Sequence, residues 1–136
     1  MTDFQLVRIS LRDYWTEGGT YLVSQEQRRE AVYDLIQWRC PLQEALARLS
    51  TFEWPSREEL ATVFARDIGH ALDEFWAGKI SADDLCAWAE ELQGREDIAL
   101  HPEDRDFLAD ALFQLSTPEI CGPADEVAVA LRLRLT

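Results

Sequence analysis

The sequence has few cysteines, few basic residues and no long apolar run, and each shortage excludes a class of protein. Its three cysteines, Cys40, Cys86 and Cys121, are odd in number, widely spaced and without a C-x-x-C pair. This pattern predicts neither a disulfide framework nor a zinc site, so we expect reduced, buried thiols. No run approaches the roughly 20 apolar residues of a membrane helix, and residues 1–12 lack the basic-then-apolar plan of a signal peptide. The sequence therefore predicts a soluble, cytoplasmic protein.

Motifs that hold a nucleotide or activate a nucleophile are also missing. The chain contains no G-x-S-x-G, Walker or G-x-G-x-x-G pattern. Cys86 lies among acidic residues, where a reactive thiolate is disfavoured, so packing is the better interpretation of this side chain. We therefore predict that the chain is not an enzyme and has neither catalytic residues nor a cofactor.

One group of residues has the composition of a metal or acid-base site. Asp67, His70, Asp73 and Glu74 follow helical spacing, which brings carboxylates and an imidazole together on one helical turn. A single helix supplies too few ligands, and the only other histidine, His101, precedes a proline. The preferred interpretation is an exposed polar face, and no metal site is predicted.

Acidic residues outnumber basic ones by 26 to 13, which gives a net charge of -13. Residues 53–126 hold nineteen acids and five bases, a net charge of -14, whereas residues 1–52 are close to neutral. Such a charge disfavours nucleic acid and anionic membranes as direct partners and favours a basic protein. The alternative is a solvated surface that only keeps the protein soluble.

Repeated helix starts, each followed by an apolar stripe, predict a mainly α-helical bundle. The best marked start is Ser81, with acids in the first turn and an apolar stripe that includes Leu85 and Trp88. Capping boxes predict further starts at Ser24, after a loop over residues 17–20, and at Ser56, before a long central helix. We expect five to seven helices in a single domain that spans residues 1–136.

Three segments carry weaker or different signals. Residues 7–12 and 127–135 alternate apolar with other residues, so short strands at the two termini stay open beside the helical interpretation. Gly94 is placed to leave its helix in a left-handed conformation, and residues 95–98 are then expected to form a charged loop.

Five tryptophans supply either core or binding anchors. Trp76 and Trp88 adjoin apolar stripes and are predicted to pack inside the protein. Trp54, between Glu53 and Pro55 in a connection, is the candidate anchor for a partner.

The remaining candidate site is a dense acidic region within residues 83–110. Ten carboxylates in it lie largely off the apolar stripes, so we expect them to contain the core of a face that binds a partner. They are Asp83, Asp84, Glu90, Glu91, Glu96, Asp97, Glu103, Asp104, Asp106 and Asp110.

Four short segments in the same part of the chain resemble small bacterial immunity proteins, including those of contact-dependent growth inhibition. These segments are residues 78–85 (Gly-Lys-Ile-Ser-Ala-Asp-Asp-Leu), 88–90 (Trp-Ala-Glu), 94–98 (Gly-Arg-Glu-Asp-Ile) and 115–120 (Leu-Ser-Thr-Pro-Glu-Ile). The resemblance implies a stoichiometric inhibitor that occludes a cognate toxin domain, commonly a nuclease. The alternative is a nucleic-acid mimic or regulatory adaptor that binds a basic host or phage protein.

Overall fold

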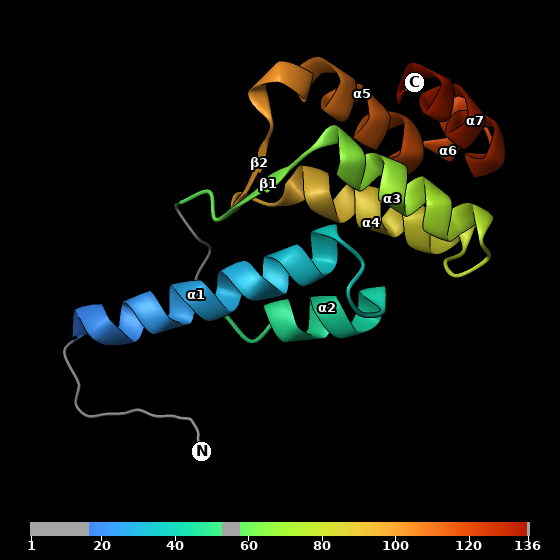
Figure 1. Cartoon of the computed structure of the whole chain (residues 1–136). Coiled ribbons are helices and arrows are strands. Elements are labelled where there is room, and N and C mark those ends of the chain that lie inside the picture. The colour runs from blue at the N-terminus through green and yellow to red at the C-terminus, as the bar shows by residue number, and fades with distance from the viewer. Residues whose placement is uncertain (1–16, 53–57, 136) are drawn as a thin grey trace.

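The chain folds mainly into helices, and the computed structural model describes residues 17–52 and 58–135. The elements, in chain order, are α1 (Glu17–Ile36), α2 (Leu42–Leu49), β1 (Ala61–Val63), α3 (Ala65–Trp76), α4 (Ala82–Gly94), β2 (Ile98–Leu100), the 3-10 helix η1 (Pro102–Asp104), α5 (Arg105–Ser116), α6 (Pro118–Cys121) and α7 (Ala124–Leu135). Figure 1 shows α1 beside α2, the α3–α4 pair next to them, and α5, α6 and α7 beyond. The predicted mainly α-helical bundle of five to seven helices is confirmed.

One hydrophobic core joins helices from α1 to α7. Its fully buried side chains include Val32, Leu35, Ile36, Ile68, Leu72, Leu85, Trp88, Leu108, Leu112 and Leu131. Trp88 is the largest of them, and its Nε1 donates a hydrogen bond of 2.9 Å to the carbonyl oxygen of Leu35. The carbonyls in the last turn of α1 lack intrahelical donors, so Trp88 satisfies one of them. The predicted packing of Trp88 is confirmed, whereas Trp76 is 44% exposed and that prediction is wrong.

Helix α4 begins where its sequence predicts. The Ser81 side chain accepts a hydrogen bond of 3.0 Å from the backbone N–H of Asp84, which satisfies one free donor of the first turn. Asp83 and Asp84 place negative charge at the positive end of the helix. The apolar stripe of α4, with Leu85 and Trp88 at its centre, is buried against the core.

The long central helix predicted from Ser56 is wrong in extent, because α3 begins only at Ala65. Ser56 itself lies outside the described residues. Residues 61–63 form β1 instead, and Phe64 stays extended while its N–H donates to the Asp67 carboxylate at 2.8 Å. Asp67 therefore caps α3 from within its first turn.

The predicted charged loop at residues 95–98 also needs correction, since Ile98 opens strand β2. β2 pairs with β1 in parallel, with Ala61 opposite Ile98, and the α3–α4 pair makes the crossover that a parallel pairing requires. Gly94 ends α4 in the helix, and Arg95 leaves it in an extended conformation, so the left-handed exit expected at Gly94 does not occur.

The ends of the described chain are helical. Helix α1 includes residues 17–20, so the loop expected there is wrong; the glycine pair costs roughly 1 kcal/mol per residue in a helix but does not forbid one. Helix α7 covers residues 127–135, which excludes the strand alternative at that end. The other terminal alternative, residues 7–12, lies outside the described residues.

Candidate functional site

The ten predicted acids do not lie on one continuous surface. Four of them, Asp83, Asp84, Glu90 and Glu91, belong to α4 and lie off its buried stripe, with Asp83 and Glu90 exposed. The others lie in the connection to α5 or on α5 itself. The structure therefore divides the predicted face into parts with different environments.

Asp97 is buried, with 1% of its surface exposed, and serves the fold. It pairs with Arg95 Nε at 2.8 Å and with Arg28 Nε of α1 at 3.1 Å. Burial alone raises the pKa of Asp97, but the hydrogen bonds and charges of Arg95 and then of Arg28 outweigh burial and leave the pKa below its ordinary value. Asp97 thus joins α1 to the end of α4.

Three further acids of the predicted set already have a basic side chain as a neighbour. Glu91 pairs with Arg95 at 3.0 Å, and the Asp104 carboxylate lies 3.4 Å from His101 Nδ1. Asp110 accepts a bond of 2.6 Å from Arg134 of α7. That bond, followed by one from Gln114, lowers the pKa of Asp110. Asp110 is therefore directed toward α7.

Glu96, Glu103 and Asp106 are exposed at the end of the molecule that holds the two strands. This end lies at the C-terminus of α4, whereas Asp83 and Asp84 lie in the first turn of the same helix. The sequence alone does not show that these two groups of acids lie at opposite ends of α4, because it does not establish how the helices are arranged in space.

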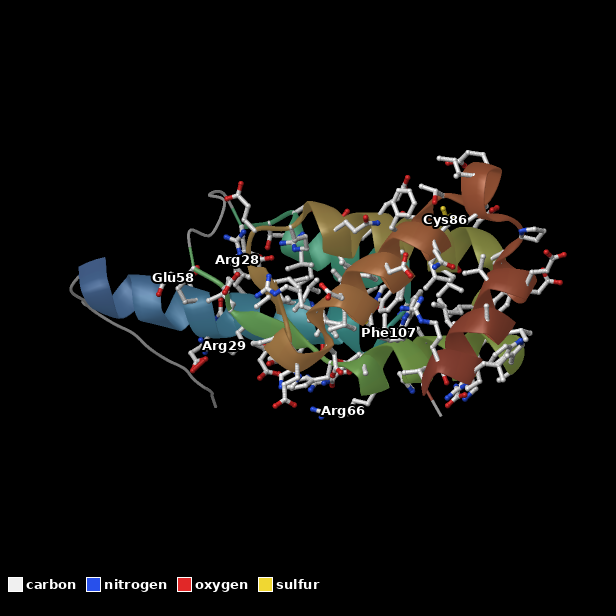
Figure 2. All side chains as sticks on the ribbon, turned by 90° about the horizontal axis from the view of Figure 1, so that it is seen from above. Arg28, Arg29, Glu58, Arg66, Cys86 and Phe107 are labelled. Carbon is white, nitrogen blue, oxygen red and sulfur yellow. The ribbon has the colours of Figure 1, made fainter. Side chains whose placement is uncertain are left out.

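Three carboxylates, those of Asp83, Glu90 and Glu119, are near enough to Cys86 for their charges to act on its thiol. Figure 2 shows Cys86 on α4, well away from Arg28. Asp83, Cys86 and Glu90 share one face of α4 at i, i+3 and i+7, and Glu119 approaches from α6. Burial raises the pKa of the Cys86 thiol, and the negative charges of Glu90, Glu119 and Asp83 raise it further. We call Asp83, Glu90 and Glu119 the acidic patch.

Comparison with protein-family models, with curated proteins and with solved structures found no match.

The acidic patch has no cationic partner within the described residues. Seven arginines make ion pairs with acids outside it, namely Arg28, Arg29, Arg39, Arg48, Arg95, Arg132 and Arg134. The three patch carboxylates are exposed and make no ion pair within the described part of the chain. Glu96, Glu103 and Asp106 are exposed and unpaired in these same ranges as well, so the arginines leave two separate negative surfaces, one at the strands and one at the patch.

Glu119 is the patch member that sequence reasoning missed. It stands 29 residues after Glu90, directly behind Pro118, and only the packing of α5 and α6 against α4 brings it to Cys86. The one available signal is an acidic residue in the first turn of a short helix.

Two exposed apolar side chains lie on the elements that carry or adjoin the patch. Phe113 of α5 is 45% exposed and Ile120 of α6 is 72% exposed. The Cys86 thiol donates a hydrogen bond to the carbonyl oxygen of Ser116, the last residue of α5, and so links α4 to α5. Trp54, the anchor predicted from sequence, lies outside the described residues.

The possible metal group on α3 does not assemble as one cluster. His70 is exposed, Asp73 pairs with Arg132, and Glu74 pairs with Lys79. Asp67 caps the helix instead, and burial raises its pKa. Residues 17–52 and 58–135 contain no group of three His, Cys, Asp or Glu side chains that could hold a metal ion. The three cysteines are free and partly buried, so the predicted burial of their thiols holds only in part.

None of the helices in these same ranges is long and apolar enough to cross a membrane.

Proposed function

We propose that the chain is a stoichiometric binding protein that engages a basic protein surface through the acidic patch. The observation that carries this proposal is the uneven use of arginine: seven arginines pair elsewhere, and Asp83, Glu90 and Glu119 stay uncompensated. A patch of one sign raises the association rate with an oppositely charged surface by about 10- to 1,000-fold.

The exposed apolar residues near the patch would supply binding energy to the proposed interface, whereas the patch charges would mainly raise the association rate. Exposed charges at the rim of an interface mainly change the association rate, whereas desolvated apolar anchors supply much of the binding energy. Phe113 lies on α5 and Ile120 follows Glu119 on α6, and both are exposed enough to be covered by a partner. Patch and anchors together would form a small mixed interface on α4, α5 and α6.

We further propose that the partner is a toxin domain with a basic nuclease fold, and that the chain acts as its cytoplasmic immunity protein. The resemblance of residues 78–85, 88–90, 94–98 and 115–120 to immunity proteins supports this identity of the partner. The negative patch supports it physically, because an inhibitor that meets its toxin quickly limits damage.

The test first asks whether the gene beside this one encodes a secreted protein with a toxin domain, and it then uses the C-terminal domain of that protein. We expect a 1:1 complex with the wild-type chain, and protection of cells that express both proteins. A matched pair of variants, Glu90→Lys/Glu119→Lys and Glu96→Lys/Glu103→Lys, carries the same change in net charge. Protection should fall in the first variant only. Absence of any complex would reject the toxin, and a complex with a basic nucleic-acid-binding protein would favour the mimic or adaptor.

A further inference from the structure

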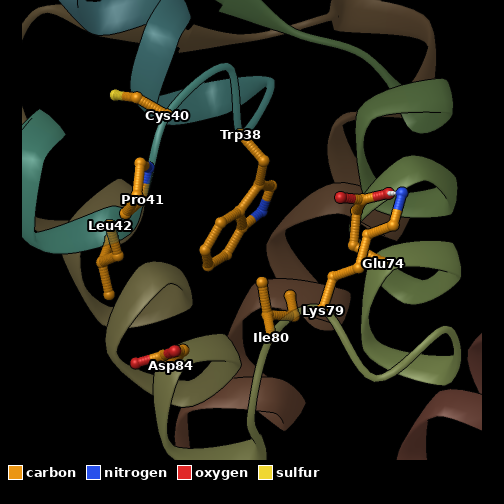
Figure 3. Close-up of a pocket in the computed structure, with 8 residues that line it drawn as sticks. All are labelled: Trp38, Cys40, Pro41, Leu42, Glu74, Lys79, Ile80 and Asp84. Carbon is orange, nitrogen blue, oxygen red and sulfur yellow. Dashed lines mark ion pairs between the residues drawn. The ribbon is translucent and has the colours of Figure 1, made fainter.

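A cavity of about 280 Å³ lies between the α1–α2 connection and the α3–α4 pair. Figure 3 shows the Trp38 ring between two groups of wall residues, with Leu42 and Asp84 on one side and Glu74 and Lys79 on the other. We call this cavity the Trp38 cleft. It is distinct from the acidic patch, although Asp84 belongs to the same helix.

The backbone of Trp38 adopts a conformation that bulky residues rarely take. Its φ is 55°, the one positive φ of a residue other than glycine among those described. Its ring lies 5.7 Å from the buried ring of Trp88, centroid to centroid, at an angle of 37°. Backbone strain that the surrounding structure maintains is concentrated at functional sites. The fold therefore holds this indole in place at the cleft.

The two neighbouring indoles differ in hydrogen bonding. Trp88 Nε1 donates to Leu35, but Trp38 Nε1 is buried and has no hydrogen-bond partner in the described structure. Buried N–H groups are almost always paired, so an orphaned donor marks a place for an acceptor oxygen. Figure 3 shows this nitrogen on the side of the ring that faces Glu74 and Lys79.

The charges at the cleft favour a cation over an anion. Glu74 and Lys79 form a loose pair of 3.7 Å at one end, and the Lys79 side chain is 67% exposed. Asp84 lies at the other end and makes no ion pair within the described residues. The cleft therefore contains two carboxylates, those of Glu74 and Asp84, and only one ammonium group, that of Lys79. The Trp38 ring, whose face can attract a cation, lies between its two ends.

We propose that the Trp38 cleft takes an arginine residue from the basic partner protein. The guanidinium group stacks on the Trp38 ring and pairs with Asp84. Arginine fits better than lysine because its planar cation stacks on aromatic rings and binds a carboxylate with two parallel bonds. This inference rests on the proposed function, since it specifies how the same partner is anchored.

The probe is N-acetyl-L-arginine amide, compared with the neutral citrulline analogue and with the lysine analogue. The five indole N–H signals in a nitrogen-15 correlation spectrum report binding, and the variant Trp38→Phe assigns the signal of Trp38. We expect a saturable shift of this signal in the millimolar range, with tighter binding of the arginine probe than of either analogue. Calorimetry should show at least threefold weaker binding by Trp38→Phe and by Asp84→Asn.

Glu96→Gln is the matched control, because it removes one exposed charge outside both the cleft and the acidic patch. It should leave the affinity for the probe within twofold of wild type. No shift of the Trp38 signal, equal binding of the citrulline or lysine analogue, or an equal loss in Glu96→Gln would overturn the assignment. The titration needs no partner protein, so its failure is separable from a failure of the proposed function.

Discussion

Asp97 illustrates how pairing and burial change the role of a single carboxylate. It belongs to the densest acidic stretch of the sequence, yet its side chain is 1% exposed and contacts two arginines. Removing one partner of a buried ion pair leaves the other charge uncompensated. The residue therefore stabilises the fold and is not accessible to a partner.

The variant Asp97→Asn tests this role. We expect it to lower the free energy of unfolding by about 3 to 5 kcal/mol, because Arg95 and Arg28 lose their charged acceptor. Urea denaturation at neutral pH measures the change. Asp106→Asn, an exposed change in the same region, should stay within about 0.5 kcal/mol of wild type and serves as the control.

The acid dependence of this effect has a defined sign. The pKa of Asp97 is lowered in the folded protein, so its stabilising contribution is complete above the unfolded-state value of about 3.9 and is lost below it. The difference in unfolding free energy between wild type and Asp97→Asn should therefore be constant near neutral pH. It should shrink as the pH falls below about 4. A difference that grows on acidification would contradict the pairing.

At the scale of elements, the start of α4 was predictable from sequence, because Ser81 at the boundary satisfies a backbone donor three residues away. The start predicted at Ser24 is wrong, since α1 already begins at Glu17. β1 and β2 were not predictable, because each has three residues and its partner lies 37 positions away. Two further contacts were not predictable, because they too depend on tertiary packing. Arg28 pairs with Asp97, 69 residues away, and Glu119 lies near enough to Cys86 to raise the pKa of its thiol.

The N-cap of α4 offers a test at this scale. Ser81→Ala should lower the free energy of unfolding by about 1 kcal/mol, because the N–H of Asp84 loses its acceptor. Ser50→Ala is the matched control, since the Ser50 hydroxyl donates only to an exposed turn and its loss should cost less. Equal losses in the two variants would show that the cap does not hold α4 in place.

The reactivity of the Cys86 thiol tests whether Glu90 of α4 and Glu119 of α6 both lie close to it. Glu90→Gln and Glu119→Gln should each lower the pKa of Cys86 and speed its alkylation at mildly alkaline pH, because each removes a nearby negative charge. The rates are measured with iodoacetamide in a background of Cys40→Ala and Cys121→Ala. Glu103→Gln should leave the rate unchanged. An unchanged rate in Glu119→Gln would separate α6 from the patch.

For the whole molecule, the central feature is the position of the acids that make no ion pair with an arginine. Sequence reasoning located the acidic region and the sign of its partner, but it could not separate the paired, the buried and the uncompensated acids. Pairing removes Asp110 and Glu91 from the available set, and burial removes Asp97. The acidic patch is what remains at the α6 end of the bundle.

The most direct test is the association rate with the basic partner at two salt concentrations. Glu90→Lys/Glu119→Lys should slow association by about tenfold at low salt, and the difference should nearly vanish at 1 M salt, where the Debye length is about 3 Å. Glu96→Lys/Glu103→Lys, with the same change in net charge, should alter the rate much less. Equal slowing by both double variants, or no slowing by the first, would contradict the acidic patch as the site of binding.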